Sequence, residues 1–149
     1  MSTMHEQKVT GLLGLALRAN KLAVGSDLVA DMATSGKMRV LLISADAGAA
    51  IKRDAAFFAR KANVPMLTLP CDKLALGKAL GRSACAICAL SDIGFAASVA
   101  KQLADISPEN TEASEILSAK NIRIQSRKGK KSAKAEIKQG NENSVQIKR

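Results

Sequence analysis

The chain has 149 residues, of which 47% are hydrophobic but only 2% aromatic, and its formal net charge is +10. This length suits one ordinary domain with an appendage and excludes two full-sized cores. No run of about 18 apolar residues occurs, so we expect no transmembrane helix. The apolar stretch from Val9 to Leu17 lacks a basic leader and a small-residue cleavage site, and we therefore expect a cytoplasmic protein.

Positive charge is concentrated toward the C-terminus. Residues 118–149 contain ten basic and two acidic side chains, which accounts for +8 of the net +10. The first 117 residues are nearly balanced, with 13 basic and 11 acidic side chains. Low hydrophobicity combined with high net charge predicts a disordered basic tail from Ser118 onward. A basic excess of this size favours a polyanionic partner.

The first third of the chain predicts helix, strand and helix in turn. Apolar residues recur at helical spacing over residues 5–18, and residues 21–24 then predict a short strand. Gly25-Ser26-Asp27 supplies a turn and an N-cap for a second helix, which Gly36 ends.

The next elements continue this alternation. Residues 40–43 form a short apolar run, the pattern of a strand covered on both faces. Asp46 is predicted to cap a third helix that ends at Asn63, and residues 64–69 predict a strand entered through Pro65. Asp72 is predicted to cap a helix that Gly81 ends.

Residues 84–90 predict the fourth strand, and Asp92 is predicted to cap a last helix that runs to about Ala104. Alternating helices and strands are typical of the α/β class. We expect a three-layer α/β/α sandwich with a small mixed, mostly parallel four-stranded sheet. The folded domain should span residues 1–104, with residues 105–149 forming a polar linker and the basic tail.

Several ordered motifs carry a family resemblance that covers roughly residues 9–104. The motifs are Gly25-x-x-Leu28, Ser44-Ala45-Asp46, Leu76-Gly77-Lys78-Ala79-Leu80-Gly81 and Asp92-x-Gly94-Phe95-Ala96. Together they resemble the ribosomal-protein L7Ae/L30e family, in its bacterial YlxQ-like branch. The resemblance implies an α/β/α sandwich that binds RNA. In the best-understood members, the second helix and the loop before the last strand grip a sharply bent kink-turn.

The sequence departs from the kink-turn binders at both of these elements. Where they carry Gly-x-Asn-Glu-x-x-Lys at the second helix, this chain has Asp27 for Asn, Leu28 for Glu and Asp31 for Lys. Their longer apolar loop is replaced here by Gly81-Arg82-Ser83-Ala84. We therefore expect general RNA binding rather than recognition of a standard kink-turn.

The candidate RNA-binding residues fall into three groups. Basic side chains near the elements that flank the second helix are Arg18, Lys21, Lys37, Arg39 and Arg82. The opening of the second helix and the short loop add Gly25, Ser26, Asp27, Leu28, Asp31 and Ser83. The tail adds Arg127, Lys128, Lys130 and Lys131, which would neutralise phosphates without reading sequence. The competing interpretations are solvated surface charges and a solubilising tail.

Two further groups of charged residues are not expected to form a binding site. Lys52, Arg53, Arg60 and Lys61 form a second basic surface on the third helix, which we expect to be solvated rather than in contact with RNA. Asp27 and Asp31 share a helix face, but carboxylates in a first turn interact favourably with the helix dipole, and we favour that role over a metal-bridged RNA contact or an acid/base pair.

The cysteines do not predict a metal or redox site. Cys85 and Cys88 form a C-x-x-C, but residues three apart on a strand point to opposite faces, so we expect buried free thiols. The single histidine, His5, precedes the folded core, and no nucleophile-base arrangement can be assembled. We expect no cofactor, no metal and no enzymatic activity.

The sequence thus favours a non-catalytic, ribosome-associated protein that binds structured RNA. Its expected partners are RNA, above all ribosomal RNA, and ribosomal proteins, with no membrane contact and a monomeric state. The alternative is a protein-interaction adaptor that kept the fold but lost specific RNA recognition, which the acidic side chains of Asp27 and Asp31 favour.

Overall fold

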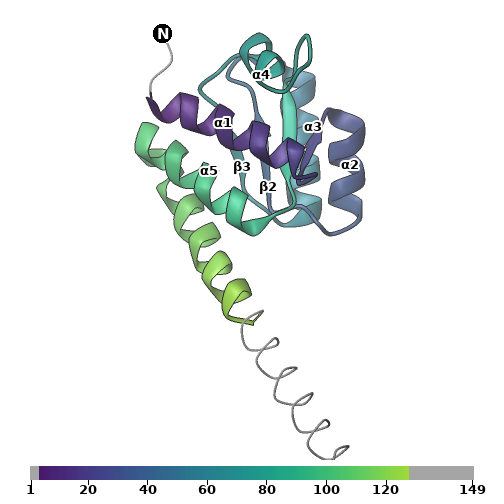
Figure 1. Ribbon diagram of the computed structural model, residues 1–149. Coiled ribbons are helices and arrows are strands. Elements are labelled where there is room, and N and C mark those ends of the chain that lie inside the picture. The colour runs from purple at the N-terminus through teal and green to yellow at the C-terminus, as the bar shows by residue number, and fades with distance from the viewer. Residues whose placement is uncertain (1–3, 128–149) are drawn as a thin grey trace, which may run out of the picture.

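The computed structural model describes residues 4–127 (Figure 1). The elements follow in the order α1 (Met4–Arg18), β1 (Leu22–Val24), α2 (Ser26–Thr34), β2 (Val40–Ile43), α3 (Ala49–Ala62), β3 (Met66–Thr68), α4 (Lys73–Ala79), β4 (Ile87–Leu90) and α5 (Ile93–Ile106). A 3₁₀ turn, Pro108–Asn110, then leads into a C-terminal helix over residues 111–127. No helix among the described residues is long and apolar enough to cross a membrane.

The four strands form one mixed sheet in the order β1-β4-β2-β3. β4 runs antiparallel to both β1 and β2, and only β2 and β3 are parallel. The fold class and the mixed sheet are confirmed, but the expectation of a mostly parallel sheet is wrong. A parallel crossover needs a connection long enough to return along the sheet. α4 has seven residues and stays at the end where β3 stops, so β4 starts there and runs in the opposite direction.

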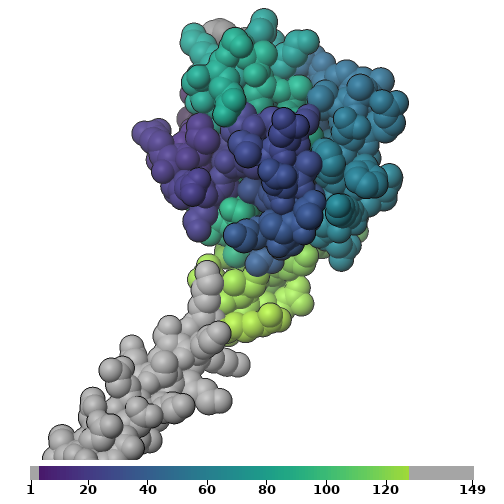
Figure 2. Space-filling view, turned by 90° about the vertical axis from the view of Figure 1, so that its right-hand side faces the viewer, coloured from purple at the N-terminus to yellow at the C-terminus, as the bar shows by residue number. Residues whose placement is uncertain are grey.

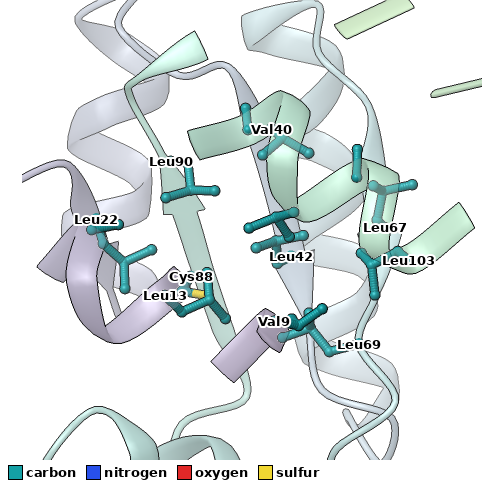
Figure 3. Close-up of a cluster of buried hydrophobic side chains, with 14 of the residues drawn as sticks. Val9, Leu13, Leu22, Val40, Leu42, Leu67, Leu69, Cys88, Leu90 and Leu103 are labelled. Carbon is teal, nitrogen blue, oxygen red and sulfur yellow. The ribbon is translucent and has the colours of Figure 1, made fainter. Parts of the chain in front are cut away.

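Helices cover both faces of the sheet, which gives the three expected layers. Along β2, Val40 and Leu42 point into one core cluster, while Leu41 and Ile43 point into the other. This alternation follows from the two-residue period of a strand. α1, α4 and α5 cover the first cluster, and α2 and α3 cover the second (Figure 1). Figure 3 shows part of the first cluster, whose buried side chains are aliphatic apart from Cys85 and Cys88.

Two of the three predicted aspartate caps are confirmed. The Asp72 carboxylate accepts a hydrogen bond from the Ala75 N–H at 2.7 Å, and the Asp92 carboxylate accepts one from the Phe95 N–H at 2.9 Å. The N-cap of α3 is Gly48, which provides no side-chain hydrogen bond to the helix. The expected cap, Asp46, has a different role. Its carboxylate instead accepts the Lys73 N–H at 2.8 Å and so satisfies a free amide at the start of α4.

The packed core continues beyond Ala104, where we expected the folded unit to end. α5 extends to Ile106, and Leu117 in the C-terminal helix is fully buried in the first core cluster. Ala113 and Ile124 pack against the same cluster at helical spacing from Leu117. The expectation of disorder from Ser118 is therefore wrong for residues 118–127, which are helical. The remaining tail, residues 128–149, lies outside the described residues.

Candidate nucleic-acid interface

α2 begins at one end of the sheet, beside the start of β4. Gly25 adopts φ 93°, a backbone conformation that glycine reaches without strain, and its N–H donates to the Ile87 carbonyl at 3.0 Å. As N-cap of α2, Gly25 provides no side-chain hydrogen bond to the first amides of the helix. This end of α2 therefore presents backbone donors and the positive end of the helix dipole.

The loop before β4 is held against α4 at this same end. The Arg82 N–H donates to the Gly77 carbonyl at 2.7 Å, and the Cys85 N–H donates to the Lys73 carbonyl at 2.9 Å. The segment places Arg82 and Ser83 on the surface, where both are exposed. In Figure 2 the segment around residue 80 lies directly above α2. We call this surface, made of residues 25–28 and 81–84, the α2 end.

The predicted basic residues do not form a single group. Lys21 and Arg39 precede β1 and β2, at the opposite end of the strands from Gly25. The Ser91 N–H, just after β4, donates to the Lys21 carbonyl at 3.0 Å, and the Arg39 N–H donates to the Leu90 carbonyl at 2.7 Å. Because β4 runs from the α2 end to this opposite end, only Arg82 joins the α2 end. Arg18 and Lys37 are close in sequence to Lys21 and Arg39 and are exposed.

The remaining predicted residues are placed as follows. Asp27 and Leu28 are exposed in the first turn of α2, with half of the Leu28 surface accessible, and Asp31 is exposed one turn further on. Gly25 and Ser26 are partly buried. Arg127 is exposed at the last described position of the C-terminal helix, whereas Lys128, Lys130 and Lys131 lie outside the described residues. The α2 end is thus mixed in charge rather than uniformly basic.

Asp46 fixes the loop after β2 next to the α2 end. Desolvation raises the pKa of its carboxyl, but hydrogen bonds, chiefly from the Lys73 N–H, outweigh it and hold the pKa below the ordinary value. The Ala45 N–H also donates to the Cys71 carbonyl at 2.9 Å. The loops that follow β2 and β3 are therefore tied together beside α4.

The three cysteines are free thiols, but the opposite-face argument for Cys85 and Cys88 is wrong. Cys85 precedes β4, so the alternation of a strand does not apply to it, and both residues belong to the first core cluster. Hydrogen bonding between the two thiols lowers the pKa of Cys85 to about 7, against the opposing effect of burial. The same hydrogen bond and complete burial raise the pKa of Cys88 well above its ordinary value.

No group of three or more metal-ligating side chains is assembled within residues 4–127. His5 does not lie apart from the fold as expected, because its Nδ1 lies 2.7 Å from the Gln102 Oε1 on α5. The start of α1 is therefore packed against α5.

A groove of about 790 Å³ was not anticipated from the sequence. It runs between the C-terminal end of α3, the edge strand β3 and the C-terminal helix, and Arg60, Met66 and Ile116 are among its lining residues. Carboxylates of Glu109 and Glu112 also line it, so the groove is mixed in charge. The helical spacing of apolar residues after Pro108 could have predicted the C-terminal helix that forms one side of this groove.

Comparison with known proteins gives a consistent result. The sequence model of the ribosomal protein L7Ae/L30e/S12e/Gadd45 family matches residues 7–100. A protein of unknown function from Bacillus halodurans is 27% identical, with a TM-score of 0.58 over 64% of this chain and 95% of that one. The 15.5 kD RNA-binding protein of Giardia lamblia shares the fold at 17% identity, with a TM-score of 0.55 over 72% of this chain and 92% of that one. No curated protein sequence matches the chain.

Proposed function

Because this chain belongs to the ribosomal protein L7Ae/L30e/S12e/Gadd45 family, we propose that it is a non-catalytic protein that binds structured RNA through the α2 end. The observation that carries this proposal is the hydrogen bond from the Gly25 N–H to the Ile87 carbonyl. It joins the start of α2 to the segment that precedes and opens β4, the two elements with which kink-turn-binding relatives grip RNA. The likeness to an RNA-binding protein of Giardia lamblia supports the same function.

The α2 end can position RNA mainly through its backbone. Free amides in the first turn of a helix, together with the helix dipole, favour a phosphate group. Arg82 adds a charge-assisted donor on the adjacent loop, and the Ser83 hydroxyl adds a neutral one. Asp27 and Asp31 lie on the same helix and oppose phosphate, so we propose recognition of RNA shape rather than of a kink-turn.

We place this protein in the cytoplasm as a monomer that associates with ribosomal RNA and ribosomal proteins. Its basic residues beyond the described part of the chain would add attraction to any RNA without sequence preference. Arg18, Lys21, Lys37 and Arg39 are proposed to contact phosphates that continue past the opposite end of the sheet.

A protein-interaction adaptor is the second candidate function. The observation that favours it is Leu28, which exposes half of its surface between the acidic Asp27 and Asp31. An apolar side chain with flanking carboxylates suits a basic protein surface better than a phosphate backbone.

Capture of the tagged full chain from cells, with and without ribonuclease, separates the two functions. If RNA binding is the function, crosslinked RNA is recovered and co-purifying proteins disappear after ribonuclease treatment. The variant Arg82→Glu should lose most of the crosslinked RNA, whereas Lys101→Glu, on an exposed position of α5, should lose far less. Proteins that stay bound after ribonuclease, with no crosslinked RNA, would establish the adaptor instead.

A further inference from the structure

The outward face of α3 carries an exposed aromatic ring surrounded by cations. Phe57 exposes 55% of its surface, although the whole chain contains only three phenylalanines and no tyrosine or tryptophan. Arg53 lies one helical turn before it, and Arg60 and Lys61 lie one turn after it. All three cations are exposed, and we call these four residues the Phe57 face.

The ring of Phe57 is not buried, but it contacts a second aromatic ring. It meets the ring of Phe58 edge to face, with centroids 5.8 Å apart and an angle of 68° between the planes. Phe58 is half-buried and packs against the second core cluster, beside Ala55 and Ala59. The contact with Phe58 restricts the ring of Phe57 while leaving much of its surface open to solvent.

The cations of the Phe57 face are largely uncommitted within the described residues. Lys61 Nζ donates a 3.4 Å hydrogen bond to the Thr34 Oγ1 of α2, and neither Arg53 nor Arg60 makes an ion pair with a residue in 4–127. Asp54 is the one carboxylate on α3, against three cations around the ring, and Glu109 and Glu112 share only the groove that Arg60 borders. The surface therefore combines net positive charge with an accessible aromatic face.

We propose that the Phe57 face binds a single-stranded RNA segment, with one base stacked on Phe57 and phosphates held by Arg53 and Arg60. Stacking on an aromatic ring between backbone-binding cations is the physical basis of single-strand recognition. The two arginines are seven residues apart, about 10 Å along the helix axis, so they can contact different phosphates. An acidic protein partner would use the charges but would not require a flat ring.

The position of α3 suits a role beside the α2 end. α2 and α3 pack together in one layer, and Figure 2 shows both on the same face of the molecule. A structured RNA held at the α2 end can therefore extend a single strand across α3. This inference rests on the proposed function but concerns a different surface and a different kind of RNA contact.

Binding of the full chain to a fluorescent oligouridylate, followed by anisotropy, tests the role of the ring. We expect Phe57→Leu to weaken binding at least about five-fold, since loss of stacking removes a substantial contribution per base. Phe57→Tyr should bind like the wild type because it keeps the ring. Leu15→Ala, at an exposed apolar position on α1, is the matched control and should change nothing. Equal binding by Phe57→Leu and wild type would overturn the proposal.

The phosphate contacts are tested through salt dependence and crosslinking. The double variant Arg53→Gln/Arg60→Gln should reduce the slope of log affinity against log salt by about 0.7 for each lost contact. Photocrosslinking with 5-bromouridine should give an adduct at Phe57, and an adduct confined to other residues counts against the proposal.

A structured hairpin RNA separates this inference from the proposed function. Hairpin binding should respond to Arg82→Glu and not to Phe57→Leu. If the chain binds neither RNA, the proposed function itself fails. If it binds both and Phe57→Leu weakens neither, only the single-strand surface is wrong.

Discussion

The backbone of Gly77 lies so close to that of Ala84 that a Cβ at position 77 would stand 2.6 Å from the Ala84 Cα. The same would-be Cβ would lie 2.7 Å from the Ala84 nitrogen, so no side-chain rotation could relieve the overlap. This contact explains in physical terms why glycine occupies the second position of the 76–81 motif. It seats the segment that carries Arg82 and Ser83 against α4 and so shapes one half of the α2 end.

Gly77→Ala should therefore destabilise the fold by about 1–3 kcal/mol, the usual cost of overpacking, even though alanine is the better helix former. Gly11→Ala is the matched control, because it adds the same methyl group to a helix where no atom lies within 4 Å. We expect that change to stabilise by up to about 1 kcal/mol. Urea denaturation followed by circular dichroism measures both. Equal stability of the two variants would contradict the close contact.

The local elements could be predicted from the sequence because each depends on nearby residues. The Val40–Ile43 strand is an uninterrupted apolar run, and Asn63 ends α3 as expected. The direction of β4 could not be predicted in this way. It depends on α4 remaining at the end of the sheet, which involves the Gly77–Ala84 contact and the Asp46 hydrogen bond across 27 residues.

The candidate site was only partly predictable for the same reason. The resemblance placed α2 beside the loop before β4, and the hydrogen bond of Gly25 to Ile87 agrees with it. We grouped Lys21 and Arg39 with Arg82 because all three were predicted near the ends of helices or strands. That criterion does not distinguish one end of a strand from the other. Phe57 was not singled out because a lone aromatic residue forms no sequence motif, and its exposure in the structure indicates a surface role.

Leu117 should contribute to the stability of the domain as strongly as a residue of the central sheet. Leu117→Ala should cost about 2–5 kcal/mol, since a fully buried leucine leaves a cavity when truncated. Ile122→Ala, at a position 69% exposed on the same helix, should change stability by about 0.5 kcal/mol or less. If both variants unfold at the same urea concentration, the folded unit ends before this helix, as the sequence first indicated.

Thiolate absorbance should reveal Cys85 as the first cysteine to ionise. Its pKa is lowered to about 7 while that of Cys71 is raised to about 11 by burial, so thiolate should form in one step near neutral pH. Cys85→Ala should abolish this step, and Cys88→Ala should move it to higher pH because the hydrogen bond to Cys85 is lost. The chain has no tyrosine or tryptophan to mask the ultraviolet signal. A step that persists in Cys85→Ala would refute the assignment.

Removing residues 128–149 should weaken binding to unrelated RNAs about equally and flatten its salt dependence. This segment holds seven basic and two acidic residues, and cations without aromatic neighbours contact phosphates rather than bases. The slope of log affinity against log salt should fall by about 0.7 to 0.9 for each lost phosphate contact. The cut is placed after Arg127 so that every described residue of the packed helix is kept. An unchanged slope would mean that the segment does not touch RNA.

Wild-type protein should bind a standard kink-turn no better than a straight duplex of the same length. Asp27 cannot offer the amide donor that kink-turn binders supply from Asn, Leu28 lacks the carboxylate acceptor, and Asp31 places negative charge where a Lys would meet phosphate. All three side chains are exposed on α2, so they face any RNA that approaches this helix. Each lost polar contact costs about 1–3 kcal/mol, and three together amount to several orders of magnitude in affinity.

The triple variant Asp27→Asn/Leu28→Glu/Asp31→Lys should then recover much of the preference for the kink-turn over the duplex. Because it raises the net charge by two, Asp105→Lys, at an exposed position on α5, provides a charge-matched control. The control should strengthen binding to both RNAs equally and leave their ratio unchanged, since added charge attracts phosphate without reading the bend. Titrating both RNAs with wild type, triple variant and control measures this ratio directly. A wild-type preference for the kink-turn that the triple change does not alter would place the RNA contact on residues other than those of α2.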